Sequence, residues 1–235
     1  MPIEQLHGGL IVSCQAPSGS PLDDPHVISA MALTAEQRGA VAVRLNGPSH
    51  IAAAKARLTI PILGIEKVVT PGSDVYITPT FAVAERVAVS GADIIALDMT
   101  RRARPQGEQV EDIIRRIREK LRVPVMADIA TLDEALFAAD CGADLIATTL
   151  CGYTSETCNV PLPALYLVEA LANHLSVPII CEGGLATPED VARAFSCGAY
   201  AVVVGTAITG ITQLVKNFVV ATPRVQGFPL SSRYS

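Results

Sequence analysis

Short apolar runs alternate with longer amphipathic segments along the chain. The runs are rich in Val, Ile, Leu and Ala, and they span Leu10–Cys14, Ala40–Leu45, Ile60–Ile65, Asp93–Met99, Val123–Ile129, Asp144–Leu150, Val177–Cys181 and Ala201–Val204. Segments with the spacing of an amphipathic helix lie between them, and these include Glu108–Leu121, Leu132–Cys141, Pro163–His174, Pro188–Cys197 and Thr209–Val219. Strands that alternate with helices of this length predict parallel βαβ units.

Two local signatures repeat along this alternation. The dipeptide Gly-Ala begins at residues 39, 91, 142 and 198, a spacing of roughly 50 residues that indicates an internal repeat. Such a Gly ends a helix in the left-handed conformation, so the next strand begins directly after it. Out of phase with these, Pro61, Pro124 and Pro178 each stand at the start of a predicted strand, where the missing N–H costs no ladder bond. One repeat equals two βα units, so the chain predicts eight strands.

Eight strands without a linker-like break predict one α/β domain over residues 1–235, a single (β/α)8 TIM barrel. Residues 1–7 and 221–235 fall outside the pattern and are expected to be peripheral tails. An open, doubly wound sheet is the alternative that the pattern leaves open.

Composition narrows the classes of function. Aromatic residues make up 4% of the chain and the net charge is −5, which argue against a nucleic-acid surface. The start of the chain lacks the basic and apolar regions of a secretory signal, and no apolar run reaches the roughly 18 residues of a membrane span. Six scattered cysteines without a CxxC pair are interpreted as small apolar fillers that stay reduced. We therefore expect a cytoplasmic protein with no nucleic-acid or membrane partner.

The strand ends carry most of the candidate chemistry. Reading round the predicted ring, they are Gln15, Arg44, Lys67, Asp98, Asp128, Thr148-Thr149, Glu182 and Gly205-Thr206. In a parallel barrel the active site forms where the strands end. An Arg, a Lys, two Asp and a Glu that point to one mouth predict a functional cluster.

Alternation of side chains along a strand distinguishes Lys67 from its neighbour Glu66. Lys67 shares the parity of the apolar Ile65, so we predict that Lys67 points into the barrel and Glu66 faces the helix layer. The reverse arrangement, with Lys67 as a solvated charge at the rim, is the alternative. Strands 3 and 7 are opposite in a ring of eight, so Lys67 and Glu182 approach a central ligand from different sides. A structural ion pair between them across the mouth also stays open.

Glycines end the last two predicted strands. Gly183-Gly184 follows strand 7, and Gly205-Thr206 follows strand 8. Barrel enzymes often bind phosphate there through backbone amides, which glycines allow to approach closely. The four histidines lie away from the strand ends, and no dinucleotide-binding or P-loop sequence is present. We therefore expect a phosphate site, no metal and no cofactor.

Six stretches of the chain carry recognisable motifs. They are Gly8–Gln15, Asp74–Thr80, Gly91–Asp98, Met126–Ile129, Thr148–Leu150 followed by Gly152–Thr154, and Val202–Thr209. Together they resemble the N-acylglucosamine-6-phosphate 2-epimerase family, also called the N-acetylmannosamine-6-phosphate 2-epimerases. The resemblance implies a barrel isomerase that interconverts N-acetylmannosamine 6-phosphate and N-acetylglucosamine 6-phosphate in amino-sugar and sialic acid catabolism. Oligomers, often dimers, are usual in such families.

The resemblance also assigns roles to residues. By similarity, Lys67 is the base that removes and returns the C2 proton of the sugar, and Glu182 is its catalytic partner. Substrate binding is implied for Gln15, Arg44, Asp128, Thr149 and Tyr153, and phosphate binding for Gly183, Gly184, Gly205 and Thr206. Ring opening gives an aldehyde at C1 that stabilises an enolate once C2 loses its proton. Lys67 must then be partly neutral, so we predict that shelter and the nearby Arg44 lower its pKa.

Some positions depart from the family pattern. Gly184 and Gly210 stand where the family commonly has an Arg or another polar residue, and Glu66 and Cys151 are also unusual.

Two other functions stay open: an aldolase that forms a Schiff base on Lys67, and a barrel that binds a phosphosugar without turnover.

Overall fold

The computed structural model describes residues 2–226, and these form a closed barrel of eight parallel strands. In chain order the strands are β1 (Leu10–Cys14), β2 (Ala42–Asn46), β3 (Ile62–Ile65), β4 (Ile94–Asp98), β5 (Val125–Asp128), β6 (Leu145–Ala147), β7 (Ile179–Glu182) and β8 (Ala201–Val204). Each strand pairs with its neighbours in sequence, and β8 pairs with β1 to close the ring. This topology confirms the predicted TIM barrel and excludes the open sheet.

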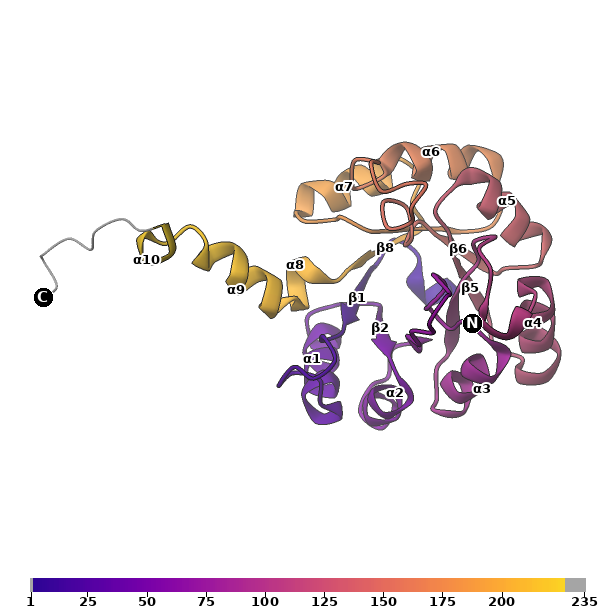
Figure 1. The fold of residues 1–235 in the computed structure, drawn as a ribbon, viewed down its shortest axis with the longest axis horizontal. Coiled ribbons are helices and arrows are strands. Elements are labelled where there is room, and N and C mark those ends of the chain that lie inside the picture. The colour runs from indigo at the N-terminus through magenta and orange to yellow at the C-terminus, as the bar shows by residue number, and fades with distance from the viewer. Residues whose placement is uncertain (1, 227–235) are drawn as a thin grey trace, which may run out of the picture.

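Helices cover the outside of the barrel (Figure 1). The α-helices are α1 (Pro25–Gln37), α2 (Pro48–Lys55), α3 (Phe81–Val89), α4 (Val110–Arg116), α5 (Leu132–Asp140), α6 (Leu165–His174), α7 (Pro188–Ser196), α8 (Thr206–Thr209), α9 (Ile211–Val219) and α10 (Pro223–Gln226). Three short helical turns, η1 (Glu4–Leu6), η2 (Pro105–Gly107) and η3 (Ile117–Leu121), complete the described elements. None of the described helices is long and apolar enough to cross a membrane.

The repeated Gly-Ala and Pro signatures have the predicted geometry. The glycines at 39, 91, 142 and 198 all have φ values between 87° and 104°, so each ends a helix in the left-handed region. Pro61, Pro124 and Pro178 lie one residue before β3, β5 and β7. Each accepts a hydrogen bond through its carbonyl from the adjacent strand. Proline is tolerated there because the ladder begins only after it, so its missing N–H removes no ladder bond.

Two apolar layers result from the alternation of side chains. One set of strand residues packs outward against the helices, and the other fills the inside of the barrel. Ala42, Ile65, Met126 and Ile180 belong to the inner layer. Polar residues two positions later on the same strands therefore point inward as well, above that layer.

The N-terminal end of the described chain differs from the predicted tail, and the predicted helix near the C-terminal end is divided in two. Leu6, in η1, is fully buried and joins the inner apolar layer of the barrel, so residues 1–7 are not a peripheral tail throughout. At the other end, Gly210 divides the predicted helix over 209–219 into α8 and α9. The segment from α8 to α10 extends away from the barrel (Figure 1). Residues 221–226 continue this segment, and residues 227–235 lie outside the described residues.

Candidate active site

A buried ion cluster lies at the mouth of the barrel. Arg44 on β2 contacts Asp128 on β5 through both terminal nitrogens, with Nη2–Oδ2 2.6 Å and Nη1–Oδ1 3.0 Å. Its Nη1 also lies 2.6 Å from Oε2 of Glu182 on β7. Arg44 is 1% exposed and Asp128 is fully buried. We call Arg44, Asp128, Glu182 and Thr149 the carboxylate cluster.

Thr149, just after β6, joins the two carboxylates of the cluster. Its Oγ1 lies 2.6 Å from Oδ1 of Asp128 and 3.1 Å from Oε2 of Glu182. A hydroxyl has one hydrogen to donate, so both contacts are hydrogen bonds only when one carboxyl carries a proton. Burial raises the pKa of Glu182 to about 7. The positive charge of Arg44 opposes this effect, and the negative charge of Asp128 adds to it. Glu182 is therefore the group in the cluster that holds and releases a proton near neutral pH.

Arg44 itself stays charged. Its burial opposes the positive charge, but Asp128 and Glu182 outweigh that cost and raise the pKa of the guanidinium above its ordinary value. Nη2 has Asp128 as its one partner in the described part of the chain, so one of its hydrogens faces no protein acceptor. Nε is buried without a partner among the same residues.

Lys67 approaches the mouth from β3, as its parity predicted. Its Nζ donates to Oε1 of Gln15 at 2.7 Å, and Nε2 of Gln15 donates to Oγ of Ser13 at 2.9 Å. Glu66 points the other way and pairs with Arg86 of α3 at 3.0 Å. Glu66 therefore faces the helix layer, as predicted, and Lys67 lies exposed at the mouth with its Nζ on Gln15.

The surroundings favour the neutral form of Lys67. Lys67 is an exposed residue at the mouth, but partial desolvation around Nζ lowers its pKa first, and the positive charge of Arg44 lowers it further, against the opposing effect of Glu182 and Asp128. Within residues 2–226, no carboxylate lies at ion-pair distance from Nζ, and Glu182 pairs with Arg44 instead. The structural Lys67–Glu182 ion pair is thus absent from the described residues.

The loops after β7 and β8 have the backbone that close approach to a ligand requires. Gly183 and Gly184 have φ values of 106° and 75°. A Cβ on Gly184 would lie 2.4 Å from Cβ of Leu162, so packing as well as conformation restricts this position to glycine. Tyr153, more than half exposed, places its ring beside Gly183. Gly205 and Thr206 begin the segment after β8, next to Ser13 of β1.

Known proteins resemble this chain over nearly its whole length. The family model described as "Putative N-acetylmannosamine-6-phosphate epimerase" matches residues 28–224. The chain belongs to this family. A relative from Thermosynechococcus vestitus, named "Putative N-acetylmannosamine-6-phosphate 2-epimerase", is 54% identical over 217 residues, 92% of this chain and 94% of its own. A relative of the same name from Cutibacterium acnes is 47% identical over 218 residues, with the same shares of the two chains.

Solved structures agree with that membership. The N-acetylmannosamine-6-phosphate 2-epimerase from Clostridium perfringens superposes with a TM-score of 0.90 at 38% identity, covering 94% of this chain and 96% of its own. A thiamine phosphate pyrophosphorylase from Pyrococcus furiosus, with a TM-score of 0.61 and 15% identity, shares the fold alone. Membership confirms the predicted enzyme class, a carbohydrate epimerase.

Two of the unusual positions, Gly184 and Gly210, are sterically closed. A Cβ on Gly210 would lie 2.6 Å from the carbonyl oxygen of Thr206, and Gly184 is restricted by Leu162 as described. Neither position can hold a cationic side chain in this conformation.

Two neighbours of the epimerase site, Asp98 and Tyr76, received no individual role from the sequence, although Asp98 was counted among the polar strand ends. Asp98 of β4 is fully buried and pairs with Arg102 at 2.7 Å and with Oγ1 of Thr100 at 2.6 Å. Burial, and then the charges of Asp128 and Asp98, raise the pKa of the Tyr76 hydroxyl, which places that ring near the mouth. The sequence signal for Tyr76 was the motif Asp74–Thr80, to which no role was attached.

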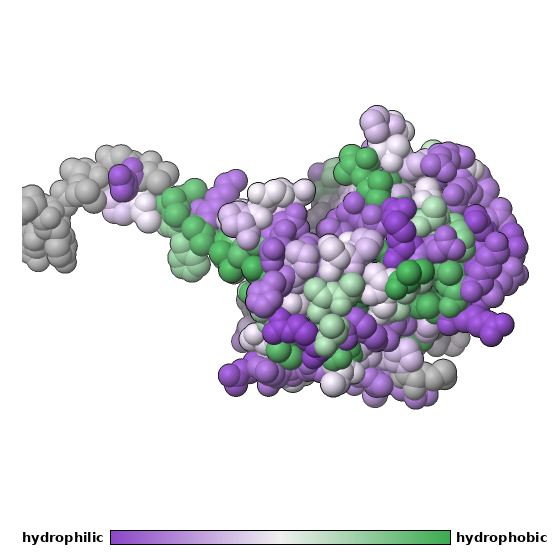
Figure 2. Space-filling model, turned by 90° about the horizontal axis from the view of Figure 1, so that it is seen from below, coloured by the Kyte–Doolittle hydropathy of each residue, from purple (hydrophilic) through white to green (hydrophobic). Residues whose placement is uncertain are grey.

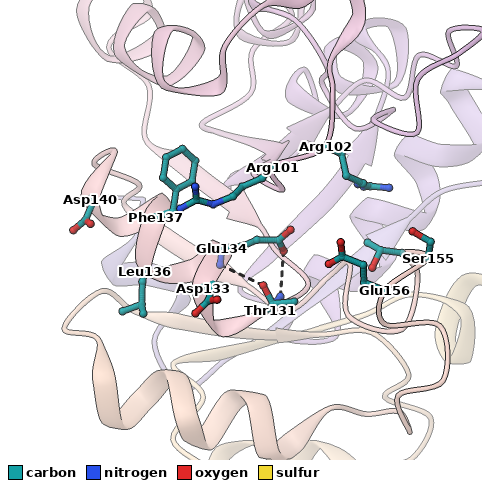
Figure 3. Close-up of a pocket in the computed structure, with 11 residues that line it drawn as sticks. Arg101, Arg102, Thr131, Asp133, Glu134, Leu136, Phe137, Asp140, Ser155 and Glu156 are labelled. Atoms are coloured by element: carbon teal, nitrogen blue, oxygen red, sulfur yellow. Dashed lines mark hydrogen bonds between the residues drawn. The ribbon is translucent and has the colours of Figure 1, made fainter.

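A cavity of about 670 Å³ opens beside the barrel mouth, among the loop after β4, α5 and the loop after β6 (Figure 3). Arg101 lies over the ring of Phe137 at 4.4 Å, and the carboxylate of Glu134 accepts from the backbone N–H groups of Ala130 and Thr131. Neither Lys67 nor any residue of the carboxylate cluster lines this cavity. Within residues 2–226, no group of three His, Cys, Asp or Glu side chains is arranged to hold a metal ion.

Proposed function

We propose that this chain interconverts N-acetylmannosamine 6-phosphate and N-acetylglucosamine 6-phosphate by removing the proton at C2 and returning it on the opposite face. The observation that carries the proposal is the meeting of two proton-transfer groups from opposite strands. Lys67 comes from β3 and is unpaired with any described carboxylate, whereas Glu182 comes from β7 and has a pKa raised to about 7. Family membership supplies the substrate class.

The reaction begins with ring opening. A proton leaves O1 and another reaches O5, and the raised pKa of Glu182 suits it to exchange these protons. Neutral Lys67 then takes the C2 proton, the C–H electrons form a C1–C2 double bond, and the aldehyde oxygen becomes an enolate. The unused hydrogen on Nη2 of Arg44, or loop amides, meets the charge on O1. Reprotonation at the other face of C2 and ring closure give the epimer.

The remaining predicted residues support this reaction at the periphery of the site. Gln15 holds Nζ of Lys67, and Asp128 and Thr149 hold Glu182 through the carboxylate cluster. Tyr153 stands at the rim where the glycine loops after β7 and β8 would receive the phosphate. Gln15, Asp128, Thr149 and Tyr153 are therefore proposed to bind substrate, and Gly183, Gly184, Gly205 and Thr206 to bind its phosphate.

Proton NMR of N-acetylmannosamine 6-phosphate with the protein in D₂O tests the proposal. We expect the C2 proton signal to disappear while signals of the gluco epimer grow. An unchanged spectrum from folded protein would refute the reaction and favour the barrel that only binds. Borohydride treatment with substrate separates the aldolase, because a Schiff base on Lys67 would be trapped and raise the protein mass, whereas an epimerase leaves the mass unchanged.

We further propose that the chain forms a homodimer through α9. Four large apolar residues on this helix, Ile211, Val215, Phe218 and Val219, are between 45% and 77% exposed. Their spacing of four, three and one places them along one side of the helix. Figure 2 shows hydrophobic residues along this segment where it projects from the barrel. An exposed apolar stripe of this kind is typical of an interface, and a second copy supplies an equal stripe.

Light scattering during gel filtration measures this state. A dimer gives twice the chain mass of 24.7 kDa, and Phe218→Asp is expected to reduce the mass to that of one chain. Val89→Asp, an equally exposed apolar position on α3, serves as the matched control and should stay dimeric. A wild-type mass of one chain at micromolar concentration would contradict the proposal.

We infer that the protein acts in the cytoplasm. All six cysteines are free thiols, the state that a reducing compartment maintains, and the proposed sugar phosphate substrate does not cross lipid membranes unaided. Detection of the epimerase activity in the cytosolic fraction of its own cells would test this, and activity confined to an exported fraction would contradict it.

A further inference from the structure

The barrel ladder is interrupted next to Lys67. Strands β3 and β4 pair over two positions, Leu63 with Ile94 and Gly64 with Ile95, and the pairing ends there. Beyond this point the segment 76–78 lies between the two strand ends. Lys67 and Ile77 form an antiparallel bridge, and the N–H of Asp98 donates to the carbonyl of Ile77 at 3.1 Å.

Thr78 fills the place where β3 and β4 separate. Its Oγ1 donates to the carbonyl of Ala96 on β4 at 2.7 Å and accepts from the N–H of Glu66 at 3.3 Å. Its own N–H donates to the carbonyl of Glu66 at 2.9 Å. One residue therefore satisfies both backbone groups of the residue before Lys67 and a carbonyl of the next strand.

Thr78 adopts a backbone conformation that its residue type disfavours. Its φ is 45°, in the left-handed region, and it is fully buried and β-branched. A β-branched residue is rare in this region and persists there only where the surroundings enforce the conformation. Pro79 follows directly and restricts the same residue further. Threonine therefore supplies its hydroxyl at this position despite an unfavourable backbone conformation.

The interruption directs Lys67 away from β4. Freed from that strand, the backbone N–H of Lys67 donates to Oδ1 of Asn46 on β2 at 2.8 Å, and Nζ donates to Gln15 beyond β1. The charged groups that act on Nζ are then Arg44 from β2, Asp128 from β5 and Glu182 from β7. Continued pairing with β4 would place Lys67 against Asp98 and its arginines instead.

We propose that Thr78 is a positioning residue for the proton transfer at C2: its strained backbone and its hydroxyl hold the segment that aims Lys67 at the substrate. The inference rests on the proposed epimerase function. It predicts that loss of the hydroxyl lowers kcat while leaving KM nearly unchanged, since Thr78 is buried and does not touch the substrate. A misplacement near 1 Å is enough for a decrease of about 10- to 100-fold.

The test compares three variants by C2 exchange rate, KM, pH profile and thermal unfolding. Thr78→Val removes the hydroxyl but keeps the shape, and Thr78→Gly removes the hydroxyl and the strain together. Both should lose kcat, and the acidic limb of the rate profile should move to higher pH, because a less confined Lys67 ammonium is better hydrated. Thr78→Ser keeps the hydroxyl and should restore both readouts. If the Val variant fails to fold, the Gly variant decides alone.

Thr80→Val is the matched control, because the hydroxyl of Thr80 accepts the N–H of Val83 to cap α3 in the same loop. It should lower the unfolding temperature without moving the pH profile. Wild-type kcat and pH profile in the folded Val or Gly variant would overturn the inference, as would a loss matched by Thr80→Val at equal stability. Absence of C2 exchange in the wild-type protein would instead refute the proposed function.

Discussion

The two ends of the barrel use the same acidic residue types for different purposes. At the bottom, Asp93 and Asp144 precede β4 and β6, and their carboxylates accept the first backbone N–H of the neighbouring strand. They pair with Lys55 and Arg118 in partly exposed positions. At the mouth, the carboxylates of Asp128 and Glu182 bind no strand backbone among residues 2–226, and they share the buried Arg44.

This difference distinguishes acidic residues that stabilise the start of a strand from acidic residues that can take part in proton transfer. An exposed pair is screened by water and contributes little, whereas a buried cluster has large effects on proton affinity. Burial and mutual contact, more than the presence of acidic residues at a strand end, identify the site of proton transfer. Substitutions at matched positions of the two ends test this difference.

The largest contrast is expected between two lysines. Lys67→Met removes the proposed base, and turnover should fall by about 10⁴-fold with little change in thermal stability. Lys55→Met, at the bottom, should keep normal turnover, since its Nζ contacts Asp93 only. Initial rates of C2 proton exchange by NMR measure both. Normal turnover in Lys67→Met would show that another group is the base.

The next contrast concerns stability. Arg44→Met leaves Asp128 and Glu182 buried without their counter-ion, and the free energy of unfolding should decrease by about 3–5 kcal/mol. Asp93→Asn breaks an exposed ion pair but keeps an acceptor for the N–H of Ile62, so the decrease should stay below about 1 kcal/mol. Urea unfolding at neutral pH compares them. Equal losses would mean that the two ends are electrostatically alike.

The smallest effect is a change in the pH dependence of stability. Glu182 has a pKa raised from 4.5 to about 7, so the folded state binds its proton more tightly than the unfolded state. Its contribution is most favourable below pH 4.5 and is lost as the pH rises to about 7. Glu182→Gln cannot titrate, so wild type minus variant stability should decrease across this window. A constant difference in urea unfolding at pH 5 and pH 8 would contradict the raised pKa.

The repeating part of the fold was predictable from the sequence because its causes are local. The Gly-Ala dipeptides fix helix ends, and the apolar runs fix the eight strands within a few residues. Parity then placed Lys67 inside and Glu66 outside, since a pleated strand permits one choice. The polar residues at the strand ends also predicted that Arg44, Asp128 and Glu182 lie at the same mouth, although their contacts with one another were not predicted.

What the sequence did not predict depends on contacts between distant segments. The bidentate pairing of Arg44 with Asp128 requires two strands across the barrel, and the insertion of Thr78 between β3 and β4 requires a break in the ladder. The departure of α9 from the barrel also follows no local pattern, because the same amphipathic spacing suits a helix packed on its own strand. Leu6 similarly gains its burial from an opening that exists only in the closed ring.

The burial of Leu6 has a consequence for how substrate and product reach the site. Leu6 packs with the inner apolar layer, so the described side chains fill the interior of the barrel and a ligand binds at its mouth. The two epimers must enter and leave by the same route and cannot occupy it together. Each sugar phosphate is then a competitive inhibitor of the conversion of the other, and the net flux follows their relative concentrations outside.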